Sequence, residues 1–171
     1  MTDPAVWPDN PFWTFSVGLY ARPGVAAACL GLQDRHGLDV NVLLYCVWLG
    51  AERGVQVTEA DAAQIAARAA SWHDAIVRPL RALRVAMKTR QHGAPLTLSD
   101  VLRNDIKRAE LDAERIEQQI LFTQNWSDAP SATRSTPIAR DNIGAYFKSL
   151  GIRPYSEDEE EVGIILAALE T

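Results

Sequence analysis

Apolar residues recur at spacings of three and four along most of this chain, which is the spacing of one helical face. Between residues 58 and 93 they form one continuous stripe, made of Ile65, Ala69, Trp72, Ile76, Leu80, Leu83 and Met87. Between about residues 97 and 125 a second stripe contains Leu98, Leu102, Ile106, Ala109, Ala113, Ile116 and Ile120. Alternation with a period of two, which would indicate a strand, is absent over any useful length. We therefore expect an all-α protein.

Capping and breaking residues divide this pattern into six to seven helices. Asn10 and Asp39 stand just before apolar runs, where their side-chain oxygens can accept backbone N–H bonds. Pro79 interrupts the longest stripe, so we expect a kink or a break there. Ser156 with Glu159 predicts a capping box for the last helix. The predicted helices cover about residues 11–20, 25–33, 40–53, 59–92, 97–125, 136–150 and 156–169.

The two long stripes predict an antiparallel helical hairpin, because only a short loop separates them. The apolar segment 40–51 is then expected in the interior, covered by the aromatic first helix. The length of 171 residues fits one domain. The sequence thus predicts a single-domain helical bundle over residues 1–171, with irregular segments at 1–10 and 127–135.

Composition and charge argue against several classes of function. The net charge of -5 and the pI near 5.2 oppose nucleic acid as a partner, because phosphate backbones attract basic surfaces. The most apolar run, Val40–Ala51, would span about 18 Å as a helix, which is too short for a hydrocarbon core of roughly 30 Å. We therefore expect no membrane span.

Residues 1–7 do not resemble a secretory signal, and Cys29 and Cys46 lie in apolar runs typical of reduced core thiols. These features predict a cytoplasmic protein.

The first third of the chain carries a long string of motifs. They are Phe12-Trp13-Thr14-Phe15-Ser16, Leu19-Tyr20, Pro23-Gly24-Val25, Leu32-Gln33-Asp34, Asp39-Val40-Asn41 and Cys46-x-Trp48-Leu49. The string resembles a family of uncharacterised, mainly proteobacterial proteins that is classed as a domain of unknown function. The similarity continues through Trp72, Pro79-Leu80-Arg81 and Ala109-Glu110-Leu111, and it covers most of the chain except the last thirty-odd residues. The resemblance implies no activity, cofactor or partner.

Polar residues gather at the predicted junction between the second and third helices. They are Gln33, Asp34, His36, Asp39 and Asn41. Carboxylates beside an imidazole can hold a divalent ion, with Asp34, His36 and Asp39 as ligands, or can polarise a substrate. The alternative is helix capping, since Asp and Asn accept backbone N–H bonds at helix starts. We favour capping and assign no metal ligand. Asn41 enters an apolar helix and therefore needs a buried partner.

Two further clusters lie on the two helices of the predicted hairpin. The first consists of Trp72, His73, Arg78, Arg81, Arg84 and Lys88, and the second of Glu110, Glu114 and Glu117. On one helix the glutamates share a side and repel one another, so they need a cationic neighbour. The arginines can supply interhelical ion pairs. Alternatively, both clusters form a polar site inside the bundle. The arginine side chains of such a site could bind an anionic group of a ligand.

No motif for catalysis or for a cofactor stands out: the chain lacks a phosphate-binding glycine loop, a nucleophile elbow and paired cysteines. We therefore expect no cofactor and favour a protein-interaction or adaptor module. Its binding partner would be an unknown protein or a second copy of this chain. Trp7, Trp13 and Tyr20 could anchor such an interface. The acidic run 157–161 fits a first helical turn or a recruiting tail.

The alternative function is a small-molecule-binding protein or an enzyme with its polar site inside the bundle. The candidate residues for ligand or partner binding are Asp34, Asp39, Asn41, Trp72, His73, Arg78, Arg81, Glu110 and Glu114.

Overall fold

The fold is all-α across the residues that the computed structural model describes, which are 7–88, 93, 95–123 and 135–170. The elements are α1 (Pro11–Tyr20), α2 (Val25–His36), α3 (Val40–Ala51), α4 (Glu59–Trp72), a π-helical turn (His73–Val77), α5 (Arg78–Ala86), α6 (Leu96–Phe122), α7 (Thr136–Ser149), α8 (Ser156–Ala167) and a 3₁₀ turn (Ala168–Glu170). The predicted fold class is confirmed.

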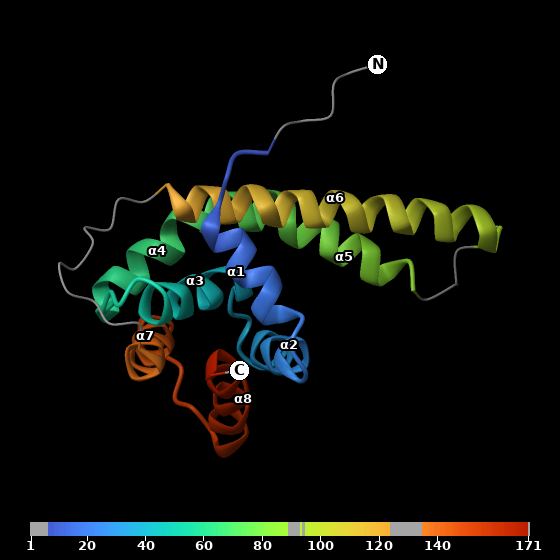
Figure 1. The fold of residues 1–171 in the computed structure, drawn as a ribbon. Coiled ribbons are helices and arrows are strands. Elements are labelled where there is room, and N and C mark those ends of the chain that lie inside the picture. Colours follow the sequence, from blue (N-terminus) through green and yellow to red (C-terminus); the bar gives the residue numbers. More distant parts are fainter. Residues whose placement is uncertain (1–6, 89–92, 94, 124–134, 171) are drawn as a thin grey trace.

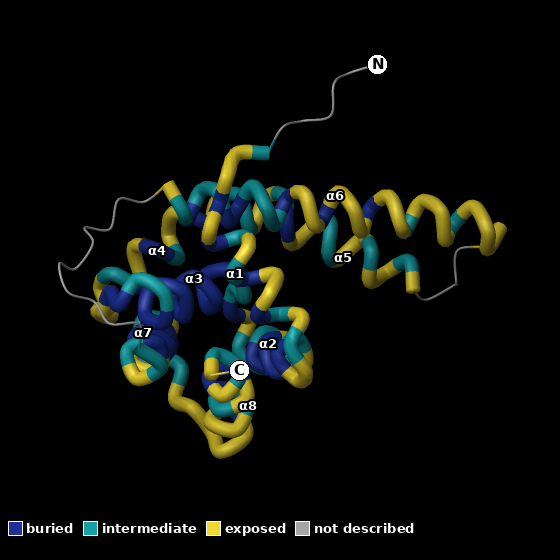
Figure 2. Tube along the Cα trace, in the orientation of Figure 1, coloured by how far each residue is buried: buried dark blue, intermediate teal, exposed yellow. Residues whose placement is uncertain are grey.

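Helix α3 forms the centre of the helical body, because its residues 41–51 are all buried (Figures 1 and 2). Its most extensive contacts are with α7. Helix α1 covers another side through Phe12, whose ring centroid lies 5.0 Å from that of Tyr45 and 5.7 Å from that of Trp48. The third helix therefore lies inside, beneath an aromatic first helix, as the sequence predicted.

A glycine permits the close approach of α3 to α7. A Cβ atom at Gly50 would lie 2.4 Å from the backbone nitrogen of Ala139 and 2.5 Å from its Cα. Both are backbone atoms of the neighbouring helix, and a close-packed interior gives them little room to move away. Contact between α3 and α7 at this point thus depends on a residue without a side chain.

The helix starts follow the predicted capping residues with one exception. The side chains of Asn10 and Asp39 accept the expected backbone N–H bonds at the starts of α1 and α3. At α8 the prediction of a box formed by Ser156 and Glu159 is wrong. The helix begins one residue earlier than a Ser156 cap requires, so its third residue is Asp158, which accepts the N–H of Tyr155 at 2.7 Å.

Helices α4 and α5, with the π-helical turn between them, run antiparallel to α6, which confirms the predicted hairpin. Figure 1 shows that α5 and the first half of α6 extend beyond α1, α2 and α8. We call residues 78–88 together with residues 96–109 the arm. The arm is largely exposed, whereas the second half of α6 packs against the body (Figure 2).

The expected interruption near Pro79 takes the form of a widened turn, and the chain stays helical. Pro79 has no N–H to donate and its ring crowds the preceding turn. The N–H of Arg78 bonds to the carbonyl of His73, five residues back. A π-helical turn adds one residue to the helix, so the buried position moves from the predicted Ile76 to Val77. Beyond residue 72 the predicted apolar stripe is only partly covered: Ile76, Leu80 and Met87 are half-buried, and Leu83 is exposed.

The stripe predicted for α6 is also wrong at several positions. Leu98 and Leu102 are exposed, because the arm carries them away from the body. In the second half of α6 the buried residues include Glu110, Glu117 and Gln118. A buried polar side chain needs a partner, so these three positions lead to the candidate site described below.

Both thiols lie in the core, as predicted. Cys29 and Cys46 are free and buried, and burial raises the pKa of each to about 12.

Of the segments expected to be irregular, residues 7–10 are irregular, while 1–6 and 127–134 fall outside the described residues. Among the helices described, none by itself has the length and apolar character needed to cross a membrane; α1 and α2 reach both only together, as a pair bent by 97°.

Candidate functional site

Three ionisable side chains from three elements meet in the interior. Asp39 precedes α3, His73 begins the π-helical turn, and Glu117 lies on the buried side of α6. The Nδ1 atom of His73 lies 3.1 Å from Oδ2 of Asp39 and 3.1 Å from Oε1 of Glu117. The Glu117 side chain is fully buried, and the other two side chains are each 13% exposed. We call these three residues the polar centre.

Asn41 holds both carboxylates of the polar centre. Its backbone N–H donates to Oδ1 of Asp39 at 2.8 Å, and its side-chain amide donates to Oε2 of Glu117 at 2.8 Å. The amide of Gln118 donates to Oδ1 of Asn41 at 2.8 Å, and the hydroxyl of Ser16 donates to Gln118 at 2.7 Å. The buried partner that Asn41 required is therefore a connected network, and such networks fix the geometry of a core.

The two carboxyl groups of the polar centre have opposite pKa shifts. Burial and the adjacent Glu117 raise the pKa of Asp39 well above its ordinary value, although backbone N–H bonds act against this. Burial also raises the pKa of Glu117, but hydrogen bonds from His73, Asp39 and Asn41 and the charge of His73 lower it by more. Neighbouring carboxyl groups resist double ionisation, so the centre favours the charge on Glu117.

Arg81 joins a second cluster at the base of the arm. Its Nε donates to Oε1 of Glu110 at 3.1 Å, and its Nη2 donates to Oε1 of Glu114 at 2.6 Å. Nη1 donates to the side chain of Gln33 on α2, and Arg84 also donates to Glu110. Glu110 and Glu114 therefore do face the arginines of the preceding helix, whereas Glu117 faces His73. These contacts tie the arm to the body.

The Glu110 ion pairs predict a pH-dependent stability. Burial raises the pKa of Glu110, but the hydrogen bonds and charges of Arg84 and Arg81 outweigh it and hold the pKa below the usual 4.5. A carboxylate with a lowered pKa stabilises the folded state above its unfolded pKa, and that contribution disappears as the pH falls through the folded pKa. We expect Glu110→Gln to lower the free energy of unfolding by about 2 kcal/mol at neutral pH and by much less near pH 3.

Urea unfolding at the two pH values measures this difference. Asp112→Asn removes an exposed carboxylate from the same helix and should change the stability by less than about 0.5 kcal/mol at either pH. An equal loss for Glu110→Gln at both pH values would contradict the assignment of the ion pairs.

A cavity of about 330 Å³ opens between α1, α2, α3 and α6. Its polar lining includes Asn41, Gln118, Arg81 and Glu114, and its apolar lining includes Val17, Leu30, Leu44 and Leu111. A larger groove of about 910 Å³ runs on along the arm and shares Arg81, Glu114 and Leu111 with this cavity. The candidate site thus has polar lining residues next to the polar centre, Asn41 among them, and it shares part of its lining with the groove along the arm.

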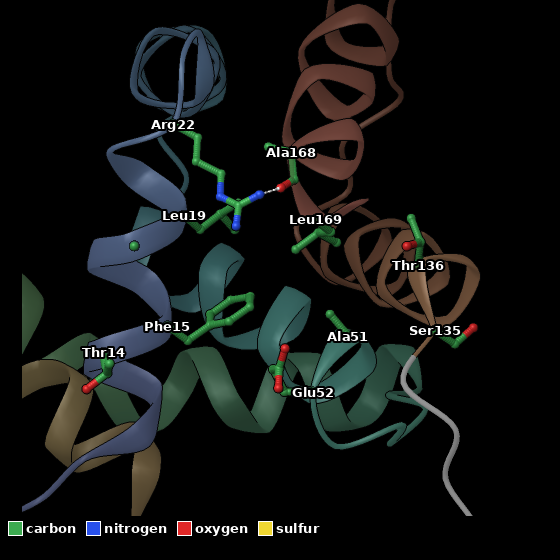
Figure 3. A pocket seen from close by; sticks show the side chains of 11 residues that line it. Thr14, Phe15, Leu19, Arg22, Ala51, Glu52, Ser135, Thr136, Ala168 and Leu169 are labelled. Atoms are coloured by element: carbon green, nitrogen blue, oxygen red, sulfur yellow. Dashed lines mark hydrogen bonds between the residues drawn. The ribbon is translucent and has the colours of Figure 1, made fainter. Parts of the chain in front are cut away.

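Another cavity, of about 430 Å³, lies between α1, the end of α3, the start of α7 and the C-terminal turn (Figure 3). Arg22 extends across it and donates to the carbonyl of Ala168. Phe15 and Glu52 also contribute to its lining. The candidate residues predicted from the sequence do not line this cavity.

The structure separates the first predicted cluster. Asp34 is exposed on the groove side, and Nε2 of His36 lies 2.8 Å from Oδ1 of Asp158. Asp39 instead belongs to the polar centre with His73. A metal site made of Asp34, His36 and Asp39 is therefore wrong. Helix α2 ends at His36 and α3 begins after Asp39. The two helices present these side chains to different partners.

The remaining candidates are divided between the site and its surroundings. The indole of Trp72 donates to the carbonyl of Ala113 at 2.9 Å and holds α4 against α6. Arg78 pairs with Asp74 at 3.0 Å on the exposed side of the helix, outside the site. The aromatic residues expected at an interface, Trp7 and Trp13, are half-buried around the guanidinium of Arg115, which lies 4.5 and 5.1 Å from their ring centroids.

Sequence reasoning missed a third ionic cluster, centred on Arg35. This side chain bonds to Glu161 at 2.9 Å and also to Asp158, and it lies 3.0 Å from Glu157. The acidic run at the start of α8 thus docks on the end of α2. The helical spacing that links Asp158 to the apolar residues Val162 and Ile165 could have indicated that Asp158 faces inward, but not which cation it meets.

Comparison with protein families matches residues 11–121 to a family described as a protein of unknown function, DUF2390. The chain belongs to the DUF2390 family. The matched part of this DUF2390 protein contains α1 to α6, and with them the polar centre, the Arg81 cluster and the arm. The resemblance noted in the sequence is confirmed, and the match ends before α7. Neither the curated proteins nor the solved structures that were searched gave a match.

Proposed function

We propose that this DUF2390 protein is a protein-interaction module whose docking face is the arm. The observation that carries the proposal is the exposure of six apolar side chains on two adjacent helices. They are Leu83, Val85, Leu96, Leu98, Val101 and Leu102, and each is between 48% and 68% exposed. Single exposed apolar residues are ordinary, but a group of them on a soluble chain is typical of a binding surface.

The charges of the arm favour one kind of partner. Lys88 and Lys107 line the groove beside Val85 and Val101, although the whole chain has a net charge of -5. Arg108 lies there too but pairs with Asp105, and the other acidic residues of the groove include Glu110 and Glu114, which pair with Arg81. An apolar surface flanked by basic residues is complementary to an amphipathic helix with an acidic edge, and charge complementarity of this kind governs partner choice. We therefore take the occupant to be an acidic amphipathic helix of another protein.

The proposal is tested by placing charges on the arm. Leu98→Asp with Leu102→Asp should weaken the binding of the partner at least tenfold, because each carboxylate must be desolvated at the interface. The partner is first captured from lysate with the tagged chain and then purified, and its affinity is measured by calorimetry with purified components.

The matched control places the same charges elsewhere. Ala63→Asp with Ala67→Asp adds two carboxylates to the exposed side of α4, and circular dichroism verifies that both double variants are folded. A partner that binds the control and the unmodified chain equally, and the arm variant weakly, supports the proposal. Equal binding by the arm variant would contradict it. If two copies of this chain associated stably through the arm, the partner of the docking face would be a second copy and not another protein.

A second candidate function rests on the cavity beside the polar centre. Its volume of about 330 Å³ falls in the range of small-molecule sites, which combine apolar walls with a few polar groups. Ligand screening by thermal shift tests this candidate. A ligand whose stabilisation is lost in Leu111→Trp, which fills the cavity wall, would support it, and stabilisation that is unchanged in that variant would contradict it.

A further inference from the structure

We propose that Asp39, His73 and Glu117 form a binding site for a single first-row divalent metal ion such as Zn²⁺ or Mn²⁺. The site is distinct from the docking face, since all three residues lie at the junction of α3, the π-helical turn and α6. The potential ligand atoms of the three side chains all lie within 4.8 Å of one another.

The separations of the donor atoms suit a shared ion. Nδ1 of His73 lies 3.1 Å from each of the two nearest carboxylate oxygens. With both donors about 2.1 Å from an ion, this separation corresponds to a ligand–metal–ligand angle of about 95°. That angle is close to the octahedral value. An imidazole nitrogen that faces two carboxylates has at most one proton to share between them, whereas one cation interacts with all three groups.

The surrounding hydrogen bonds leave the inner atoms available. Oδ1 of Asp39 and Oε2 of Glu117 both accept bonds from Asn41, so Oδ2 and Oε1 are the oxygens that face His73. Tyr146 fixes the backbone of Asp39, whose N–H donates to the hydroxyl of Tyr146 at 3.1 Å. Outer bonds that orient carboxylate ligands in this way are a regular part of protein metal sites.

The donor set selects the class of ion. Two carboxylates and one imidazole, supplied by the protein, suit Zn²⁺, Mn²⁺ or Fe²⁺, while Ca²⁺ requires six to eight oxygens and Mg²⁺ retains most of its water. Asp39 and His73 are partly exposed, which leaves room for an ion to enter and for water to complete its coordination.

Calorimetric titration of the chelator-treated full chain with Zn²⁺ and Mn²⁺ tests the site. We expect one ion per chain for at least one of these metals and weaker binding of Mg²⁺ and Ca²⁺. Glu117→Gln and Asp39→Asn keep the size of each side chain while removing its charge, and each should reduce the affinity at least a hundredfold. The melting temperature of the unmodified chain should rise with metal concentration, because the folded state alone presents all three ligands.

His36→Gln is the matched control, because His36 also pairs with a buried carboxylate, Asp158, away from the polar centre. This variant should bind the ion as the unmodified chain does. If circular dichroism shows Glu117→Gln to be unfolded, Asp39→Asn and His73→Gln take its place. The proposal would be overturned if no stoichiometric binding occurred at millimolar metal, or if the folded variants of the polar centre bound the metal unchanged. The three residues would then form a buried ionic network without a metal ion. Tighter binding of Ca²⁺ would overturn the assigned class of ion.

Discussion

Gly50→Ala should destabilise the protein by about 2–4 kcal/mol, even though alanine is the better helix former. The added Cβ would lie 2.4 Å from the nitrogen and 2.5 Å from the Cα of Ala139, and 2.8 Å from the carbonyl carbon of Ile138. Overpacking of an interior typically costs about 1–3 kcal/mol, and more where backbone must move. The gain in helix propensity, about 1 kcal/mol, offsets only part of this.

Gly144→Ala, in α7 of the same helix pair, separates packing from propensity. A Cβ at Gly144 would have no neighbour within 4 Å, so this change should leave the stability unchanged or raise it by up to about 1 kcal/mol. Chemical denaturation monitored by circular dichroism compares the two variants. If Gly50→Ala were as stable as Gly144→Ala, the contact between α3 and α7 described here would be wrong.

Asn142→Ala should destabilise the protein by about 3–4 kcal/mol. The Asn142 side chain is completely buried. It accepts the N–H of Val57 at 2.7 Å and donates to the carbonyl oxygens of Cys46 at 3.1 Å and Val55 at 2.9 Å. Each unpaired buried group costs about 1–3 kcal/mol, and the substitution removes these three bonds together. The segment after α3 would lose its buried bonds to α7 and keep the exposed one from Gln56 to Asp141.

Thermal and urea unfolding measure this loss, and hydrogen exchange of the Val57 amide reports on the same bond directly. Asn104→Ala, at an exposed position of α6, serves as the control and should change the stability by less than about 0.5 kcal/mol. Protection of the Val57 amide that is the same in Asn142→Ala and in the unmodified chain would contradict the role given to Asn142.

The helices themselves could be predicted from the sequence, because their determinants are local. Asn10 and Asp39 cap the helices that they were expected to cap, and the apolar stripes were sufficient to predict the hairpin. The π-helical turn could not be predicted in the same way. Proline can end, kink or widen a helix, and the outcome near Pro79 depends on how the turn packs against α6.

The candidate site was predictable only in part. Glutamates at spacings of three and four on α6 required a cationic neighbour, and Arg81 and Arg84 supply it. The polar centre brings together residues that are far apart in the sequence: Asp39 and His73 are separated by 34 positions, and His73 and Glu117 by 44. Periodicity gives the face on which each residue lies but not the register between two helices, so the sequence did not pair Asp39 with either partner.

The two halves of the hairpin differ in burial and in their contacts. The second half of α6 carries the buried polar residues that hold the helices together, and Arg81 ties the base of the arm to α2 through Gln33. Beyond that point the same hairpin presents Leu98 and Leu102 to solvent. An anchored base with an exposed apolar end supports the proposed docking face, because a preorganised surface lowers the entropy loss of binding.

Site-specific photo-crosslinking in living cells tests the proposed docking face most directly. A photoreactive residue is placed at Leu98 on the arm or, as the reference, at Ala67 on the exposed side of α4. The proposed function predicts an adduct of one defined mass from Leu98 that is absent from Ala67 and disappears when Leu102 is replaced by Asp. Equal labelling from both positions, or no adduct from Leu98, would contradict the proposal that the arm binds a partner.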